Sequence, residues 1–167
     1  MQTMQLILFG VVLLSLLFFG CSSKNPMQNL IQFNTEFFAK YLPEYPQARL
    51  MTKADIPEHQ LEFFDEADGK LQMLLDLNKN DVPEYIICGV SEAMLQRQEK
   101  GPYFVAIFEQ SKNGINRLYL QKLIVPPVTL DAAQTKNRSG VVISFAFYSD
   151  YAAEIYYADN TYQIENW

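Results

Sequence analysis

The sequence predicts an α+β domain: two N-terminal helices packed on one face of a curled antiparallel sheet of about seven strands, connected as a meander. Three observations lead to this fold class. Apolar residues recur at three- and four-residue spacing before residue 43, and a second short segment carries helix-capping residues. From Lys70 onward, apolar runs of strand length alternate with turn residues.

The first helix is predicted over residues 25–42. Asn25 is a suitable N-cap, and Pro26 fits the first helical position, where its missing N–H would have no helical partner. Pro43 ends the segment. The apolar stripe of this helix must be buried, most simply on a sheet, and consists of Met27, Leu30, Ile31, Phe37, Phe38 and Tyr41.

The second helix is predicted over residues 55–69. Asp55 is its expected N-cap, Glu58 occupies the capping-box position, and Gly69 is a natural stop. Carboxylates in the last turn oppose the helix dipole, and they favour a solvated acidic face over a binding role: Asp65, Glu66 and Asp68. The single histidine, His59, is expected to be exposed near the start of this helix.

Seven segments have the composition of strands: residues 71–77, 84–90, 103–110, 116–125, 141–149, 152–158 and 161–167. Residues 43–57 and 126–140 are expected to be connections, and residues 91–101 a charged excursion with a helical turn. Turns are predicted at Asn113-Gly114, Ser149-Asp150 and Asp159-Asn160. Because Tyr156 and Tyr157 are adjacent in a strand, one ring is expected to face outward.

The length and charge of the chain limit the classes of protein to consider. A chain of 167 residues favours a single domain, predicted over residues 27–167. The formal net charge is −6, and no cluster of Lys and Arg occurs. A nucleic-acid partner is therefore excluded, because binding phosphates depends on basic residues gathered on one face.

The N-terminus contains an apolar leader. Residues 6–19 form an apolar run too short to cross a bilayer as a helix and suited to the core of a secretory signal peptide. The following residues "FFGCSS" resemble the lipobox of bacterial lipoproteins, with Gly20 before the cleavage point and Cys21 as the lipidated residue. The alternative is an uncleaved signal anchor.

The lipoprotein resemblance implies a signal peptide over residues 1–20 and a lipidated tether over residues 21–26. Cys21 would carry a thioether-linked diacylglycerol and an acylated amine such as a palmitoyl amide, and several acyl chains together anchor a protein stably. Ser22 after the cysteine implies the outer membrane, facing either the periplasm or the surface. The remaining cysteine, Cys88, lies in an apolar stretch and is expected to be a buried, inert thiol.

The segment "DLNKNDVPEY" has oxygen-bearing side chains at alternate positions. Calcium prefers six to eight hard oxygen ligands. Here the spacing offers Asp76, Asn78, Asn80, the carbonyl of Val82, and Glu84. This spacing resembles the calcium loops of FG-GAP repeats and, more loosely, of dockerin modules, which implies a Ca²⁺ ion held between two strands. The alternative is a plain hairpin loop, because Asn and Asp are ordinary turn residues.

Few features of the sequence indicate chemistry, and a bound ion in this loop would be structural. The position that is usually glycine in such loops is Asp81, which must enter the left-handed backbone region. No nucleophile, metalloprotease or phosphate-binding motif occurs. The sequence therefore predicts a membrane-anchored binding or assembly module with an envelope protein partner. The alternative is an envelope-polymer hydrolase that uses a carboxylate pair.

Overall fold

The computed structural model describes residues 31–134, 138–145 and 151–166. The helices and strands below belong to the unit Gln32–Trp167. Several predictions lie outside the described residues: the leader over 1–20, Cys21 with the tether over 21–26, the start of the helix over 25–42, and the Ser149-Asp150 turn.

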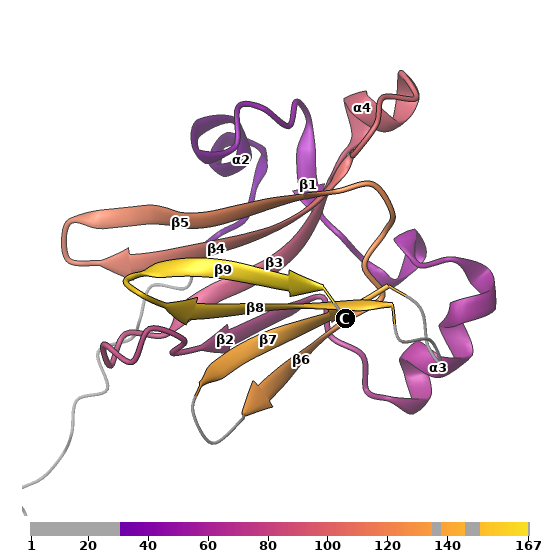
Figure 1. The fold of residues 1–167 in the computed structure, drawn as a ribbon. Coiled ribbons are helices and arrows are strands. Elements are labelled where there is room, and N and C mark those ends of the chain that lie inside the picture. Colours follow the sequence, from indigo (N-terminus) through magenta and orange to yellow (C-terminus); the bar gives the residue numbers. More distant parts are fainter. Residues whose placement is uncertain (1–30, 135–137, 146–150, 167) are drawn as a thin grey trace, which may run out of the picture. The chain divides into compact units, whose positions relative to one another are not determined.

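The strands form two antiparallel sheets (Figure 1). Sheet 1 contains β1 (Ala48–Leu50), β2 (Gln72–Leu75), β3 (Glu84–Ser91), β4 (Tyr103–Ser111) and β5 (Gly114–Leu123). Sheet 2 contains β6 (Thr129–Gln134), β7 (Ser139–Ser144), β8 (Ala152–Ala158) and β9 (Thr161–Asn166). The predicted combination of helices and antiparallel strands is confirmed. The single curled sheet of about seven strands is wrong, since the described residues form nine strands in two sheets.

β3 is the central strand of sheet 1. Two short strands pair with the same edge of β3: β1 with residues 89–91 and β2 with residues 84–87. The other edge pairs with β4, and β4 pairs with β5. All eight residues of β3 are buried, as expected for a strand covered on both faces. Sheet 2 is a simple meander in the order β6-β7-β8-β9.

The main hydrophobic core lies between the two sheets. Alternate residues of β3, namely Ile86, Cys88 and Val90, face this core together with residues of β4. Sheet 2 contributes buried side chains from three strands: Leu130, Val141, Ile143 and Ile155. Burial of each large aliphatic side chain contributes about 1.5–3 kcal/mol before entropy is counted. This core fixes sheet 2 against one face of sheet 1.

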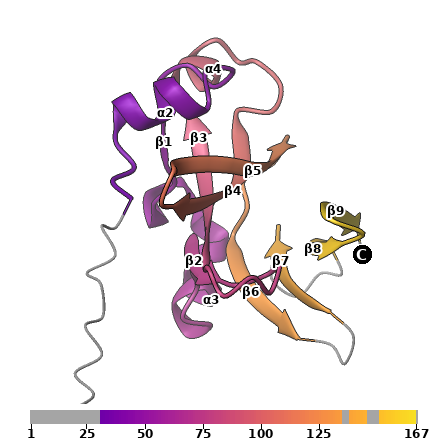
Figure 2. The same ribbon diagram turned by 90° about the vertical axis from the view of Figure 1, so that its left-hand side faces the viewer.

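The opposite face of sheet 1 is covered by α2 (Thr35–Tyr41) (Figures 1 and 2). Asn34 caps this helix, and its side chain accepts a hydrogen bond from the Phe37 amide at 2.9 Å. The helix predicted over residues 25–42 is therefore wrong over residues 31–34, which are described and not helical, because the cap at Asn34 starts the helix at Thr35. Edge-to-face aromatic contacts join Phe37 and Phe38 of the helix to Phe108 and Phe104 of β4, with ring centroids 5.0 and 6.2 Å apart. Arg117 of β5 donates to the Tyr41 carbonyl at the C-terminal end of the helix.

The second predicted helix is shorter than expected and packs elsewhere. Residues 53–66 form two 3₁₀ turns, Lys53–Asp55 and Glu58–Gln60, followed by α3 (Leu61–Glu66). Pro57 separates the two turns, and Asp55 accepts from the Thr52 amide instead of capping α3. Leu61 and Phe64 pack against the core between the sheets, so the expectation of two helices on one sheet face is wrong.

The connections differ in how well the sequence predicted them. The excursion after β3 contains α4 (Glu92–Gln96), capped by Ser91, which confirms the expected helical turn. Asp159 and Asn160 both have positive φ, as a type I′ hairpin requires. The stretches 43–57 and 126–140 contain β1 and β6, which were not predicted. Among the helices of the described residues, none is long and apolar enough to cross a membrane.

Candidate functional site

The loop at residues 76–84 connects β2 to β3, and its polar side chains fold back over its own backbone. The carboxylate of Asp76 accepts from the amides of Asn80 and Asp81 at 3.1 and 3.0 Å. The side-chain carbonyl of Asn78 accepts from the Asn80 amide, and that of Asn80 accepts from the Val82 amide. These are Asx-type turns, and they bring three of the five predicted ligand residues together.

The backbone of the loop is tight. Asp81 has φ of 64° and Lys79 has φ of 58°, both in the left-handed region. The prediction that Asp81 takes the conformation usually reserved for glycine is therefore confirmed. Aspartate tolerates this region better than most residues because its short polar side chain forms local hydrogen bonds.

Glu84, the last predicted ligand, is completely buried and is held by protein donors. Its Oε2 accepts from the Leu77 amide at 2.8 Å, and its Oε1 accepts from the Tyr162 hydroxyl at 2.6 Å. Burial, followed by the hydrogen bond to Glu84, raises the pKa of Tyr162 above its ordinary value. The Glu84 carboxylate thus joins the loop to β9 of the opposite sheet.

Two further contacts fasten the loop to its surroundings. The side-chain amide of Asn80 donates to Glu109 of β4 at 2.7 Å, and that of Asn78 lies 3.4 Å from the Tyr162 hydroxyl. Glu109 is also directly opposite Glu84 in the β3–β4 register. The loop therefore contacts strands of both sheets, a role that the local sequence pattern did not reveal.

The loop offers oxygen ligands, but few of them are charged. Asp76, Asn78 and Asn80 present side-chain oxygens on one turn of chain, whereas Glu84 faces Leu77 and Tyr162. In the part of the chain that the structure describes, no three His, Cys, Asp or Glu side chains are arranged to hold a metal ion. A cation here would depend on amide and backbone oxygens, which calcium accepts.

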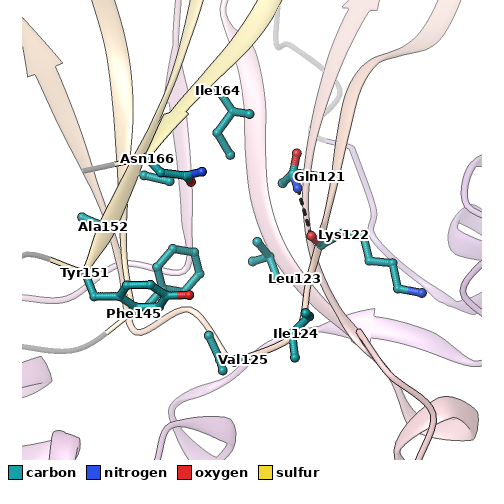
Figure 3. Close-up of a pocket in the computed structure, with 11 residues that line it drawn as sticks. Gln121, Lys122, Leu123, Ile124, Val125, Phe145, Tyr151, Ala152, Ile164 and Asn166 are labelled. Atoms are coloured by element: carbon teal, nitrogen blue, oxygen red, sulfur yellow. Dashed lines mark hydrogen bonds between the residues drawn. The ribbon is translucent and has the colours of Figure 1, made fainter.

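A separate apolar groove of about 400 Å³ lies between the C-terminal end of β5 and strands β8 and β9 (Figure 3). Of the four large apolar side chains exposed among the described residues, three line this groove. Their exposed fractions are 74% for Ile124, 61% for Tyr151 and 38% for Val125. Large apolar side chains gathered at one place on a surface are typical of interaction sites.

The groove combines apolar side chains with polar groups and contains no acidic residue. Its lining residues are Gln121, Lys122, Leu123, Ile124, Val125, Phe145, Tyr151, Ala152, Ala153, Ile164 and Asn166, and they include no carboxylate. Phe145 and Tyr151 lie on one side and face Leu123 and Ile124, whereas the Lys122 side chain points away from the groove (Figure 3). The predicted strand over 116–125 ends at Leu123, and this ending leaves Ile124 and Val125 exposed ahead of Pro126.

The thiol and the imidazole lie in different environments. Cys88 is buried in the core between the sheets, as predicted, and burial raises the pKa of its thiol. His59 is exposed in a 3₁₀ turn, also as predicted. Tyr157 packs against the core, while Tyr156, on the other face of β8, lies under the guanidinium of Arg138 at 3.8 Å from the ring centroid.

No family model, curated protein or solved structure matches this chain. Function is therefore inferred from the residues and geometry of the chain itself.

Proposed function

We propose that this chain is a lipoprotein of the bacterial cell envelope, anchored through Cys21, whose folded unit acts as a binding or assembly module. The observation that carries the binding role is the gathering of Ile124, Val125 and Tyr151 around one groove. The leader and the "GCSS" sequence at residues 20–23 support the anchor. The partner is an envelope protein, and the outer membrane is the location that Ser22 favours.

The anchor is tested by intact mass spectrometry and membrane fractionation. We expect the mature chain to begin at Cys21 and to carry the mass of a diacylglycerol and an amide-linked acyl chain. Cys21→Ala is expected to block processing or to release the protein from the membrane. Cys88→Ala is the matched control, because Cys88 is buried and its loss leaves lipidation intact. A chain that still carries Met1, or that lacks acyl mass, would refute the anchor.

We also propose that a calcium ion stabilises the loop at residues 76–84, held by Asp76, Asn78, Asn80, the Val82 carbonyl and Glu84. The support is the gathering of side-chain oxygens from Asp76, Asn78 and Asn80. Two carboxylates in such a set favour weak binding, near the ~10⁻³ M typical of extracellular modules. Such an ion would act on stability only.

The calcium site is tested by thermal unfolding. With a dissociation constant of about 1 mM, 10 mM calcium adds about 1.4 kcal/mol, or roughly 3–6 °C in Tm. Asp76→Ala is expected to abolish this rise. Asp81→Asn is the matched control, because it removes a nearby charge, keeps a side chain that tolerates positive φ, and leaves the predicted ligands in place. If the Tm is the same with calcium and with a chelator, the loop binds no calcium and is an ordinary turn.

The binding role is tested at the groove. Ile124→Ser removes its most exposed apolar side chain, and Leu74→Ser is the matched control at an exposed apolar position on β2. Crosslinking in intact cells, followed by purification from detergent-solubilised membranes, is expected to yield a stoichiometric partner with the native chain and with Leu74→Ser. If the Ile124→Ser variant still yields the same partner, the groove is not the binding site.

A further inference from the structure

The outer edge of β5 is open for strand pairing. In the part of the chain that the structure describes, β5 is the last strand of sheet 1 and pairs only with β4. Nine of its ten residues are exposed or half-buried, and only Leu123 is buried. An edge strand of this length presents unpaired N–H and C=O groups, to which an extended segment can add.

The charge of this edge is opposite to that of the whole chain. β5 contains Arg117 and Lys122 and no acidic residue, whereas the chain carries a net charge of −6. Arg117 pairs with Glu44, but Lys122 takes part in none of the ion pairs formed among the described residues. The side chain of Lys122 packs over Gly101: a Cβ built on Gly101 would lie only 2.2 Å from the Cε of Lys122. This contact places Lys122 beside the exposed residue Lys100.

The two faces of β5 differ at its C-terminal end. Leu123 faces the apolar groove, and Lys122, one residue earlier, points to the opposite side (Figure 3). A strand added along this edge would alternate in the same way, with one set of side chains toward the groove and the other toward Lys122. The edge therefore fits a strand that alternates apolar and acidic residues.

We propose that β5 and the adjoining groove bind an extended, acidic segment of a partner protein, which adds to sheet 1 as a further strand. Main-chain hydrogen bonds to β5 hold the segment, its apolar side chains fill the groove beside Ile124 and Val125, and its carboxylates lie near Lys122. This inference rests on the proposed binding role and names the chemistry of the partner.

A second copy of this chain is a poorer occupant of the same edge. Antiparallel pairing of two β5 strands centred between Tyr119 and Leu120 would place Arg117 of one copy opposite Lys122 of the other. Like charges that face each other across strands are destabilising. The basic residues thus disfavour self-pairing and favour an acidic strand.

The test uses the full mature chain in detergent and a fluorescent nine-residue peptide of alternating valine and glutamate. Its comparisons are a valine–lysine peptide and a valine–glutamate peptide of scrambled order. We expect fluorescence anisotropy to show binding of the alternating acidic peptide, weakening as salt rises. Hydrogen exchange by mass spectrometry should slow over residues 114–123 and stay unchanged over residues 72–75 of β2, which do not line the groove.

Two variants with matched controls complete the test. Lys122→Glu is expected to weaken binding about tenfold, whereas Lys79→Glu, at an exposed lysine in the 76–84 loop, leaves it unchanged. Ile124→Ser should weaken binding, and Leu74→Ser should not. Equal binding of the lysine peptide, protection of β9 instead of β5, or dimerisation through β5 would overturn the proposal. The peptide-binding test involves no membrane. A negative result in it would therefore not affect the proposed lipid anchor, and a negative result for the anchor would not affect the peptide binding.

Discussion

Replacing Tyr162 by phenylalanine tests whether the buried carboxylate joins the two sheets. The Tyr162 hydroxyl lies 2.6 Å from Oε1 of Glu84, a fully buried residue. Tyr162→Phe leaves this oxygen without a donor, while the Leu77 amide still serves the other oxygen. Hydrogen bonds to charged groups contribute about 1.5–3 kcal/mol, and an orphaned buried acceptor costs a similar amount. We therefore expect Tyr162→Phe to lower the free energy of unfolding by about 2–3 kcal/mol.

The assay is urea unfolding at pH 7, followed by far-UV circular dichroism. The expected result is a lower midpoint with an unchanged m-value, which marks a loss of stability without a change in the surface exposed on unfolding. In thermal unfolding, the same loss corresponds to a fall in Tm of roughly 5–10 °C for a unit of this size.

Tyr119→Phe is the matched control. The Tyr119 ring lies 6.0 Å from that of Tyr162, but its hydroxyl donates to the neutral side-chain oxygen of Gln121 at 3.0 Å. We expect a loss of no more than about 1 kcal/mol. A double-mutant cycle with Glu84→Gln should show coupling, because the penalty at Tyr162 depends on the charge it serves. Equal losses from Tyr162→Phe and Tyr119→Phe would refute the reasoning.

Three other predictions concern packing and pH. Gly89→Ala places a methyl carbon 2.1 Å from the ring of the buried Phe104, so urea unfolding should show a loss of about 2 kcal/mol. Gly140→Ala places a methyl carbon 2.3 Å from Oε1 of the buried Glu154. Displacing that carboxylate should also lower the free energy of unfolding by about 2 kcal/mol. An unchanged urea midpoint would contradict this close contact between Gly140 and Glu154. Burial, with a neighbouring carboxylate, raises the pKa of Tyr45 from 10.0 to about 12, which favours the neutral phenol in the fold. Its contribution is therefore fully present below pH 10 and lost between pH 10 and 12, a fall that Tyr45→Phe should reduce.

The elements that sequence alone predicted are those set by neighbouring residues. The hairpin predicted at Asn113-Gly114 is present as the β4–β5 connection, but one residue earlier: Ser111 pairs with Gly114, which has positive φ, and the loop is Lys112-Asn113. The strand over 84–90 was found because a continuous apolar run flanked by turn residues fits a strand buried on both faces. In the loop, alternate spacing correctly brought Asp76, Asn78 and Asn80 together, since their side chains bond to backbone amides two to five residues further along the chain.

The elements that sequence missed depend on distant residues. β1 has three residues, and it is a strand only because Ala48 pairs with Ser91, far along the chain. The division into two sheets follows Pro126 and Pro127, which lack the N–H groups needed to continue a ladder. An alternating pattern shows which residues share a face, but it does not show to which sheet the face belongs.

The candidate sites show the same limit. The groove combines residues of β5, β8 and β9 with Phe145 and the segment at 124–125, and no local spacing brings these together. The acceptor role of Glu84 toward Tyr162 spans 78 residues of sequence. In contrast, the exposed Ile124 and Val125 before two prolines were visible in the sequence and were assigned to a strand because their β propensity is high.

Tyr162 also distinguishes the two interpretations of the loop at residues 76–84. A calcium ion coordinated by Glu84 must compete with the Leu77 amide and the Tyr162 hydroxyl for its carboxylate oxygens. Tyr162→Phe frees Oε1, so calcium should bind this variant more tightly than the native chain and restore part of its lost stability at about 10 mM, where a site of millimolar affinity is nearly full. Urea unfolding with calcium, with magnesium and with a chelator measures this. If the three curves of the variant coincide, Glu84 serves the fold alone and the loop is a turn.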